Sequence, residues 1–118
     1  MDKNIKSLKK ILKEYRNIYL ISQSISTDKI FRGTFAEIQK IIYASDILRR
    51  TPVHGELYYK ILYYNYMSPE IYYNVYELID VLKSENIYLS HRTYYRRKNE
   101  ALVLLLKIID STKNPSAS

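Results

Sequence analysis

Glycine and proline are scarce in this chain, with two glycines and three prolines among 118 residues. Tight hairpins depend on these residues at their turns, so a fold built from many strands has few places to reverse direction. The apolar residues also recur at intervals of three and four rather than two, which is the period of an amphipathic helix. The sequence therefore predicts an all-α fold of about five helices.

The first predicted helix runs from about residue 3 to 22, and its apolar residues form a heptad-like stripe that includes Leu8, Leu12, Tyr15 and Tyr19. A second helix is predicted over about 35–50, because Thr34-Phe-Ala-Glu37 matches a capping box. The segment 51–55 contains a proline and a glycine and ends this helix.

Three more helices follow in the prediction. A short tyrosine-rich helix ends near Met67, and Ser68-Pro69 then looks like the cap and first turn of a fourth helix over about 69–83. A connection that contains Asn86 but no glycine leads to a fifth helix over about 91–110, capped by Ser90. We expect a single helical domain over 1–110 and a disordered polar tail over 111–118.

Positive charge is concentrated at the two ends of the chain. The net charge is +7, and the cations outnumber the anions by six to two in residues 1–16 and by seven to three in residues 83–118. Clustered lysine and arginine bind a phosphate backbone by releasing its counterions, so double-stranded DNA is the expected partner. No run of 18 apolar residues and no signal peptide is visible, so we expect a cytoplasmic protein with no membrane partner.

The fifth predicted helix combines a buried side with a basic one. When Tyr94 is placed at the centre of the buried side, four residues fall on or beside the opposite face and are predicted to read base edges: Arg92, Thr93, Arg96 and Asn99. Five neighbours are better placed for phosphates: Ser90, His91, Tyr95, Arg97 and Lys98. The alternative is a solvated amphipathic helix whose basic face has no partner.

The run from Ile87 to Leu102 resembles the C-terminal motif of ArpU-like and RinA-like late transcription regulators of phages and mobile elements. The resemblance covers about residues 65–109 and implies a helix-turn-helix, similar to region four of sigma factors, over about 65–110. It places six residues on the recognition-helix pattern: Ser90, Thr93, Tyr94, Tyr95, Arg96 and Ala101. The first 60 residues carry no motif of the family, and its usual small turn residue is missing here.

The last predicted helix becomes apolar around its whole circumference at Val103–Leu106, which one neighbouring helix cannot cover. The stripe of the first helix is the natural cover, from the same chain or from a second copy. We predict a homodimer or higher oligomer, in which the N-terminal helices over 3–50 take part, and packing within one chain is the alternative. The surface predicted to be shared comprises Leu8, Leu12, Tyr15, Tyr19, Val103 and Leu106.

Enzymatic chemistry is not expected from this composition. The chain has no cysteine, and its two histidines, His54 and His91, have no dense carboxylate cluster near them in sequence. No phosphate-binding glycine loop or Ser-His-Asp arrangement can be assembled, so we expect no cofactor, no metal and no small-molecule substrate.

The predicted function is therefore a sequence-specific DNA-binding transcription regulator, which the resemblance attributes to a phage or mobile element. The alternative is a protein-interaction module that binds a transcription regulator or an RNA polymerase subunit. That alternative depends on tyrosines of the third and fourth helices, since tyrosine is enriched at interface hot spots; they are Tyr58, Tyr59, Tyr63, Tyr64, Tyr66, Tyr72, Tyr73 and Tyr76.

Overall fold

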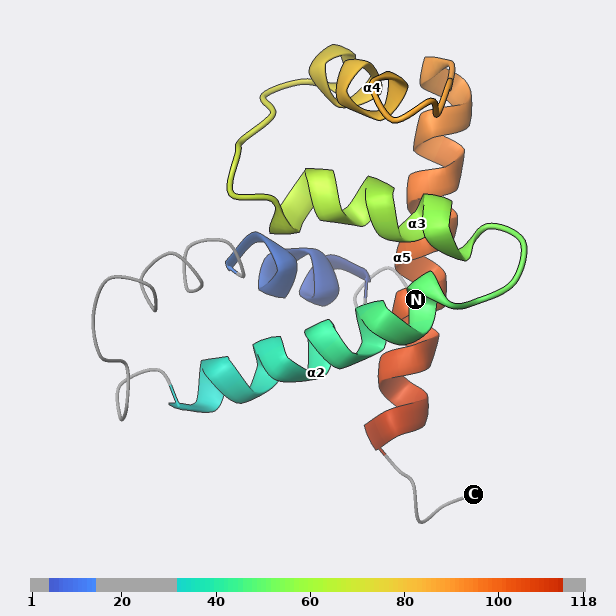
Figure 1. Ribbon diagram of the computed structural model, residues 1–118. Helices are drawn as coiled ribbons and strands as arrows, with labels where there is room; N and C mark the ends of the chain where they lie inside the picture. The colour runs from blue at the N-terminus through green and yellow to red at the C-terminus, as the bar shows by residue number, and fades with distance from the viewer. Residues whose placement is uncertain (1–4, 15–31, 114–118) are drawn as a thin grey trace.

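The computed structural model describes residues 5–14 and 32–113, and all regular elements in these ranges are helical (Figure 1). Residues 5–14 form an N-terminal helical segment. It is followed by α2 (Arg32–Arg49), α3 (Gly55–Leu62), the π-helical turn η1 (Tyr63–Met67), α4 (Val75–Lys83) and α5 (His91–Lys113). The predicted all-α class is confirmed. None of the helices in these two ranges has the length and apolar character needed to cross a bilayer.

The first two predicted helices are present with different limits. Residues 5–14 are helical as expected, whereas Tyr15 and Tyr19 lie outside the described residues. The α2 helix begins at Arg32, so Thr34 lies inside it and the predicted capping box is wrong. Gly33 does not stop the helix because a glycine in a helix costs only about 1 kcal/mol. Burial of one face of α2 outweighs that cost, with Ile41, Ala44 and Leu48 in the core.

The chain reverses tightly between α2 and α3, as the proline and glycine in 51–55 predict. Val53 adopts a left-handed backbone conformation with φ 76°, which is uncommon for a β-branched residue. Gly55 then packs against the end of α2, where an added Cβ would lie 2.5 Å from the carbonyl oxygen of Leu48. Only glycine allows α3 to start this close to the preceding helix.

The third predicted helix, with its end near Met67, corresponds to α3 and η1 together. The π-helical turn closes with a 2.8 Å bond from the Ser68 N–H to the Tyr63 carbonyl. It turns Tyr66 and Met67 into the core.

The predicted start of the fourth helix at Ser68-Pro69 is wrong, because α4 begins at Val75. Ser68 is extended, with ψ 140°, which is the conformation that a following proline favours. The real cap is Asn74, whose Oδ1 accepts a 3.0 Å bond from the Glu77 N–H, while the Glu77 carboxylate accepts from the Tyr73 N–H at 2.6 Å. This reciprocal pairing satisfies two amides at the helix start.

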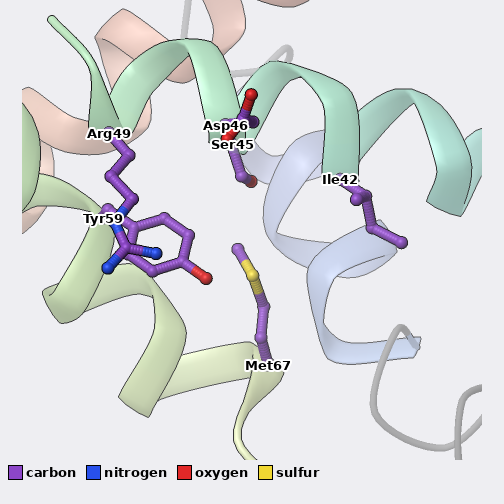
Figure 2. A pocket seen from close by; sticks show the side chains of 6 residues that line it. All are labelled: Ile42, Ser45, Asp46, Arg49, Tyr59 and Met67. Carbon is purple, nitrogen blue, oxygen red and sulfur yellow. The ribbon is translucent and has the colours of Figure 1, made fainter.

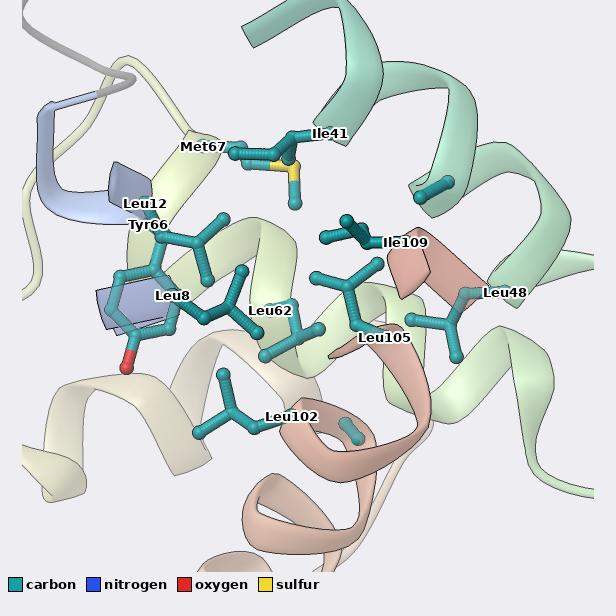
Figure 3. Close-up of a cluster of buried hydrophobic side chains, with 12 residues drawn as sticks. Leu8, Leu12, Ile41, Leu48, Leu62, Tyr66, Met67, Leu102, Leu105 and Ile109 are labelled. Carbon is teal, nitrogen blue, oxygen red and sulfur yellow. The ribbon is translucent and has the colours of Figure 1, made fainter. Parts of the chain in front are cut away.

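Two clusters of buried side chains hold the helices together, and α5 contributes to both. The larger cluster joins the segment 5–14, α2, α3, η1 and the C-terminal part of α5 (Figure 3). The smaller cluster joins Ile61 of α3, Leu78 and Leu82 of α4, and Tyr94 near the start of α5. In Figure 1, α4 accordingly lies beside the first turns of α5, while α2 and α3 cross α5 further along.

The larger cluster takes up two residues of the predicted oligomer surface. Leu8 and Leu12 are 3% and 0% exposed and lie in one cluster with Leu102 and Leu105 of the same chain, so a shared surface at these two leucines is wrong. Of the predicted surface, Val103 and Leu106 are partly buried, and Leu106 packs against the cluster. The first helix therefore covers α5 from within one chain, because its apolar stripe matches the apolar part of α5.

Candidate nucleic-acid interface

The connection between α4 and α5 makes a tight turn without glycine. Asn86 adopts φ 67°, a left-handed conformation that asparagine tolerates better than most residues. The turn is closed by bonds from the Asn86 N–H to the Lys83 carbonyl at 2.9 Å and from the Ile87 N–H to the Leu82 carbonyl at 3.0 Å. Asn86 thus allows the chain to reverse at a position where glycine is the more usual residue.

A network from α3 and η1 fixes this turn in place. Glu85, within the turn, forms a 3.0 Å salt bridge with Lys60 and accepts a hydrogen bond from the Tyr64 hydroxyl. The Tyr64 hydrogen bond, then Lys60, lowers the pKa of Glu85, and the same bond raises the pKa of Tyr64 to about 12. Sequence analysis missed this network, because nothing local links residues 21 positions apart.

Ser90 caps α5 as predicted. Its Oγ accepts a 3.2 Å bond from the Thr93 N–H and donates to the Thr93 Oγ1 at 3.0 Å. The first backbone bond of the helix runs from the Tyr94 N–H to the Ser90 carbonyl at 2.8 Å. The Ser90 and Thr93 side chains therefore define the helix start, and their hydroxyls are already engaged with each other.

Tyr94 anchors α5 to the rest of the domain. Its ring is 1% exposed, and its hydroxyl accepts a hydrogen bond from Asn65, which also donates to the Ile61 carbonyl at 2.7 Å. Burial raises the pKa of Tyr94 to about 12. With this ring in the smaller cluster, the rotation of α5 about its axis is fixed, and so is the direction of its opposite face.

Three predicted base-reading residues lie on that opposite face. Arg92, Arg96 and Asn99 are exposed, and they are spaced so that successive members are about one helical turn apart. Within the described residues, neither arginine forms a salt bridge with a carboxylate. Thr93, the fourth predicted base reader, is half-buried and held by Ser90.

The predicted phosphate contacts separate into two groups. Tyr95 and His91 are exposed beside the outer face, and the His91 ring lies edge-on to the Tyr76 ring with centroids 4.5 Å apart. Arg97 instead forms a 2.8 Å salt bridge with Glu100, which also accepts a 2.9 Å bond from Tyr58 of α3. These contacts, the Glu100 bond first, raise the pKa of Arg97.

Lys98 lies away from the outer face altogether. Its Nζ is 5.6 Å from the centroid of the buried Tyr66 ring. A helical wheel of α5 alone places Lys98 on the side of Tyr94, and the segment 5–14 covers that side in the structure. The outer face of α5 is therefore defined by Arg92, Arg96 and Asn99, with His91 and Tyr95 at its edge.

Most of the tyrosines proposed for a protein-interaction surface are structural. Tyr66 is buried, and five others are partly buried, namely Tyr58, Tyr59, Tyr63, Tyr64 and Tyr72. Tyr73 and Tyr76 are 82% and 67% exposed, and Ile71 beside them is 53% exposed. Of these eight tyrosines, the two that are exposed to a protein partner lie at the start of α4 and in the loop before it.

A small pocket lies between α2 and the α3–η1 region (Figure 2), and one polar side chain in its wall lacks a hydrogen-bond partner among the described residues. Its volume is about 150 Å³, and it is lined by Ile42, Ser45, Asp46, Arg49, Tyr59 and Met67. The Ser45 hydroxyl is buried and has no hydrogen-bond partner among the described residues, whereas Arg49 is held by two bonds to Glu56 at 2.9 and 3.1 Å. Pockets for cofactors are usually at least twice this size.

No protein-family model, curated protein or solved structure matches this chain.

Proposed function

We propose that this protein is a sequence-specific DNA-binding transcription regulator that docks the outer face of α5 in the major groove. The observation that carries the proposal is the row of Arg92, Arg96 and Asn99, exposed on the face opposite the buried Tyr94. Arginine pairs with guanine and asparagine with adenine through two hydrogen bonds each, so such a row carries sequence information.

The packing of α3, α4 and α5 supports a helix-turn-helix. In this motif, the second helix enters the groove with its N-terminal residues while the first crosses the backbone. Here α4 and α5 are joined by a short turn, and α3 completes the buried cluster around Ile61, Leu82 and Tyr94. The resemblance to late regulators of phages and mobile elements covers about residues 65–109, which include α4 and most of α5, and supplies the proposed biological setting.

Selection from random DNA duplexes at moderate salt tests this proposal. We expect an enriched motif, and Arg96→Ala should cost about 1–3 kcal/mol of binding free energy on that motif while relaxing the preference at one base pair. Lys107→Ala is the matched control, because Lys107 is exposed on α5 more than two turns beyond Asn99. Recovery of no enriched motif would refute sequence-specific binding.

A protein-binding function is the second candidate, and the exposed Ile71, Tyr73 and Tyr76 favour it. Aromatic side chains of this kind form the energetic centres of many protein interfaces. A pull-down from nuclease-treated host lysate separates the two functions. Capture of a regulator or polymerase subunit that Tyr73→Ala abolishes would support protein binding, whereas recovery only with DNA present would count against it.

A further inference from the structure

Lys98 is a cation of α5 that lies off the outer face and, unlike Arg97, forms no salt bridge among the described residues. It is partly buried, and its ammonium group lies over the Tyr66 ring. Desolvation lowers the pKa of Lys98, and two nearby lysines, Lys9 and Lys13, lower it further. A positive charge is therefore held where both burial and neighbouring charges oppose it.

The packing of the segment 5–14 explains how these three lysines meet. Leu8 and Leu12 are buried in the cluster that contains Leu102, which lies one turn after Lys98 on α5. Lys9 directly follows Leu8 in the sequence, and Lys13 directly follows Leu12. The two lysines are therefore one helical turn apart and lie beside the buried stripe. The burial of Leu8 and Leu12 in this cluster places the segment 5–14 beside the part of α5 that carries Lys98, close enough for Lys9 and Lys13 to act on the Lys98 charge.

No carboxylate neutralises this cluster within the described residues. The salt bridges there involve Arg49, Arg50, Lys60 and Arg97, and none of the three clustered lysines takes part in one. Three ammonium groups gathered without an anion repel one another, and a bound anion with several charges removes that repulsion. Lysine binds phosphate as a compact point charge, with three donors on each ammonium group.

We propose that Lys9, Lys13 and Lys98 form a binding site for phosphate groups, separate from the outer face of α5. The convergence of three cations on one place favours a compact, multiply charged ligand of the di- or triphosphate class. The phosphates of a nucleic acid backbone present the same chemistry and are the other source. The site does not depend on base reading by Arg92, Arg96 or Asn99.

Inorganic tripolyphosphate is the first probe, titrated into the full chain at physiological ionic strength and followed by NMR of the lysine side chains. We expect the Lys98 resonances to shift and the pKa of Lys98 to rise when the probe binds, because the anion stabilises the charged form. Lys98→Met keeps an apolar stem over Tyr66, and this variant and the Lys9→Gln/Lys13→Gln double variant should each lose about tenfold or more in affinity.

The double variant Lys6→Gln/Lys10→Gln is the matched control. It removes the same charge from the same helix, at two exposed positions that lie further from the buried stripe. Equal loss of affinity in both double variants would overturn the proposal, since it would indicate attraction to net charge alone. Circular dichroism checks that each variant is folded. If Lys98→Met does not fold, the titration of the unmodified protein still tests whether tripolyphosphate shifts the Lys98 resonances.

A second titration, with a short DNA duplex of random sequence, distinguishes the two phosphate sources. If the protein binds tripolyphosphate, and if Lys98→Met and Lys9→Gln/Lys13→Gln leave the duplex affinity unchanged, the ligand is a free polyphosphate. Reduced duplex affinity in both cluster variants, with no response to tripolyphosphate, identifies the nucleic acid backbone. The absence of both effects overturns the site. The tripolyphosphate result is independent of the selection experiment on α5, so the two proposals fail separately.

Discussion

Two adjacent tyrosines provide a sharp test of how α5 is oriented. Tyr94 is 1% exposed in the cluster with α3 and α4, whereas Tyr95 is 55% exposed on the outer side. Truncation of a buried aromatic side chain to alanine costs about 3–5 kcal/mol, because the transfer free energy of the ring is lost and a cavity remains. Tyr94→Ala should therefore remove a large part of the 5–15 kcal/mol or so that stabilises a typical domain. Tyr95→Ala should cost about 1 kcal/mol or less, since what it loses is the edge-on contact of its ring with Tyr94.

Tyr94→Phe isolates the hydroxyl group from the ring. The variant loses the hydrogen bond from Asn65, and a bond of this kind contributes about 0.5–1.5 kcal/mol net. We expect the lower part of that range, because the Asn65 amide keeps its 2.7 Å bond to the Ile61 carbonyl. DNA affinity should be unchanged in Tyr94→Phe, since the hydroxyl faces the interior, whereas Tyr95→Ala should weaken binding to all duplexes comparably.

Urea denaturation followed by circular dichroism measures the stability of all three variants. Fluorescence anisotropy with a labelled duplex measures the DNA affinity of Tyr94→Phe and Tyr95→Ala. All binding measurements need a temperature at which every variant is folded. If Tyr94→Ala and Tyr95→Ala destabilised the protein equally, the assignment of the inner and outer faces of α5 would be wrong. A loss of DNA affinity in Tyr94→Phe would contradict the role of this residue as an internal anchor.

Four further changes test other parts of the structure. Leu12→Ala should cost about 2–5 kcal/mol in urea denaturation, independently of protein concentration, because Leu12 is fully buried within one chain; a concentration-dependent midpoint would instead indicate packing between copies. Gly55→Ala should cost about 1–3 kcal/mol, since its Cβ would overlap backbone atoms at the end of α2. Val53→Gly should raise the melting temperature, because it relieves a left-handed conformation that costs about 1–2 kcal/mol for an L-residue. The contribution of Tyr94 to stability should be fully present below pH 10, the unfolded pKa of tyrosine, and be lost as pH rises toward its folded pKa of about 12, so the fall in stability at alkaline pH should be shallower in Tyr94→Phe.

The start of α5 could be predicted from sequence because its signals are local. The Ser90 hydroxyl accepts a hydrogen bond from the Thr93 N–H, three residues ahead. From Tyr94 onward, apolar residues recur at the three- and four-residue spacing of a helix. The start of α4 was also encoded locally, but by Asn74 and Glu77 rather than by Ser68 and Pro69. Two capping signals six residues apart compete, and the proline itself favours the extended conformation at Ser68 that keeps the chain out of the helix.

The composition of the candidate interface depended on contacts that no helical wheel contains. The wheel of α5 separates the exposed Arg92 and Arg96 from the buried Tyr94 correctly. The wheel also brings Arg97 and Glu100 together, since they lie three positions apart, but it cannot show that Tyr58 of α3 bonds to Glu100 or that the segment 5–14 lies near Lys98. These two contacts follow from tertiary packing, which brings together residues far apart in the sequence.

The apolar C-terminal half of α5 no longer requires a second copy of the protein. Leu102, Leu105 and Ile109 are buried by the segment 5–14, α2, α3 and η1 of the same chain. Under the proposed function, a monomer would contact one short site with a single recognition helix, and single modules of this kind bury only about 600–1,000 Å². Base contacts by Arg92, Arg96 and Asn99 would then give sequence preference with little affinity, and further phosphate contacts would have to supply the rest. A monomer should therefore bind a single non-palindromic site with an affinity that falls steeply as the salt concentration rises. Enrichment of palindromic sites in the selection experiment would instead support the predicted dimer.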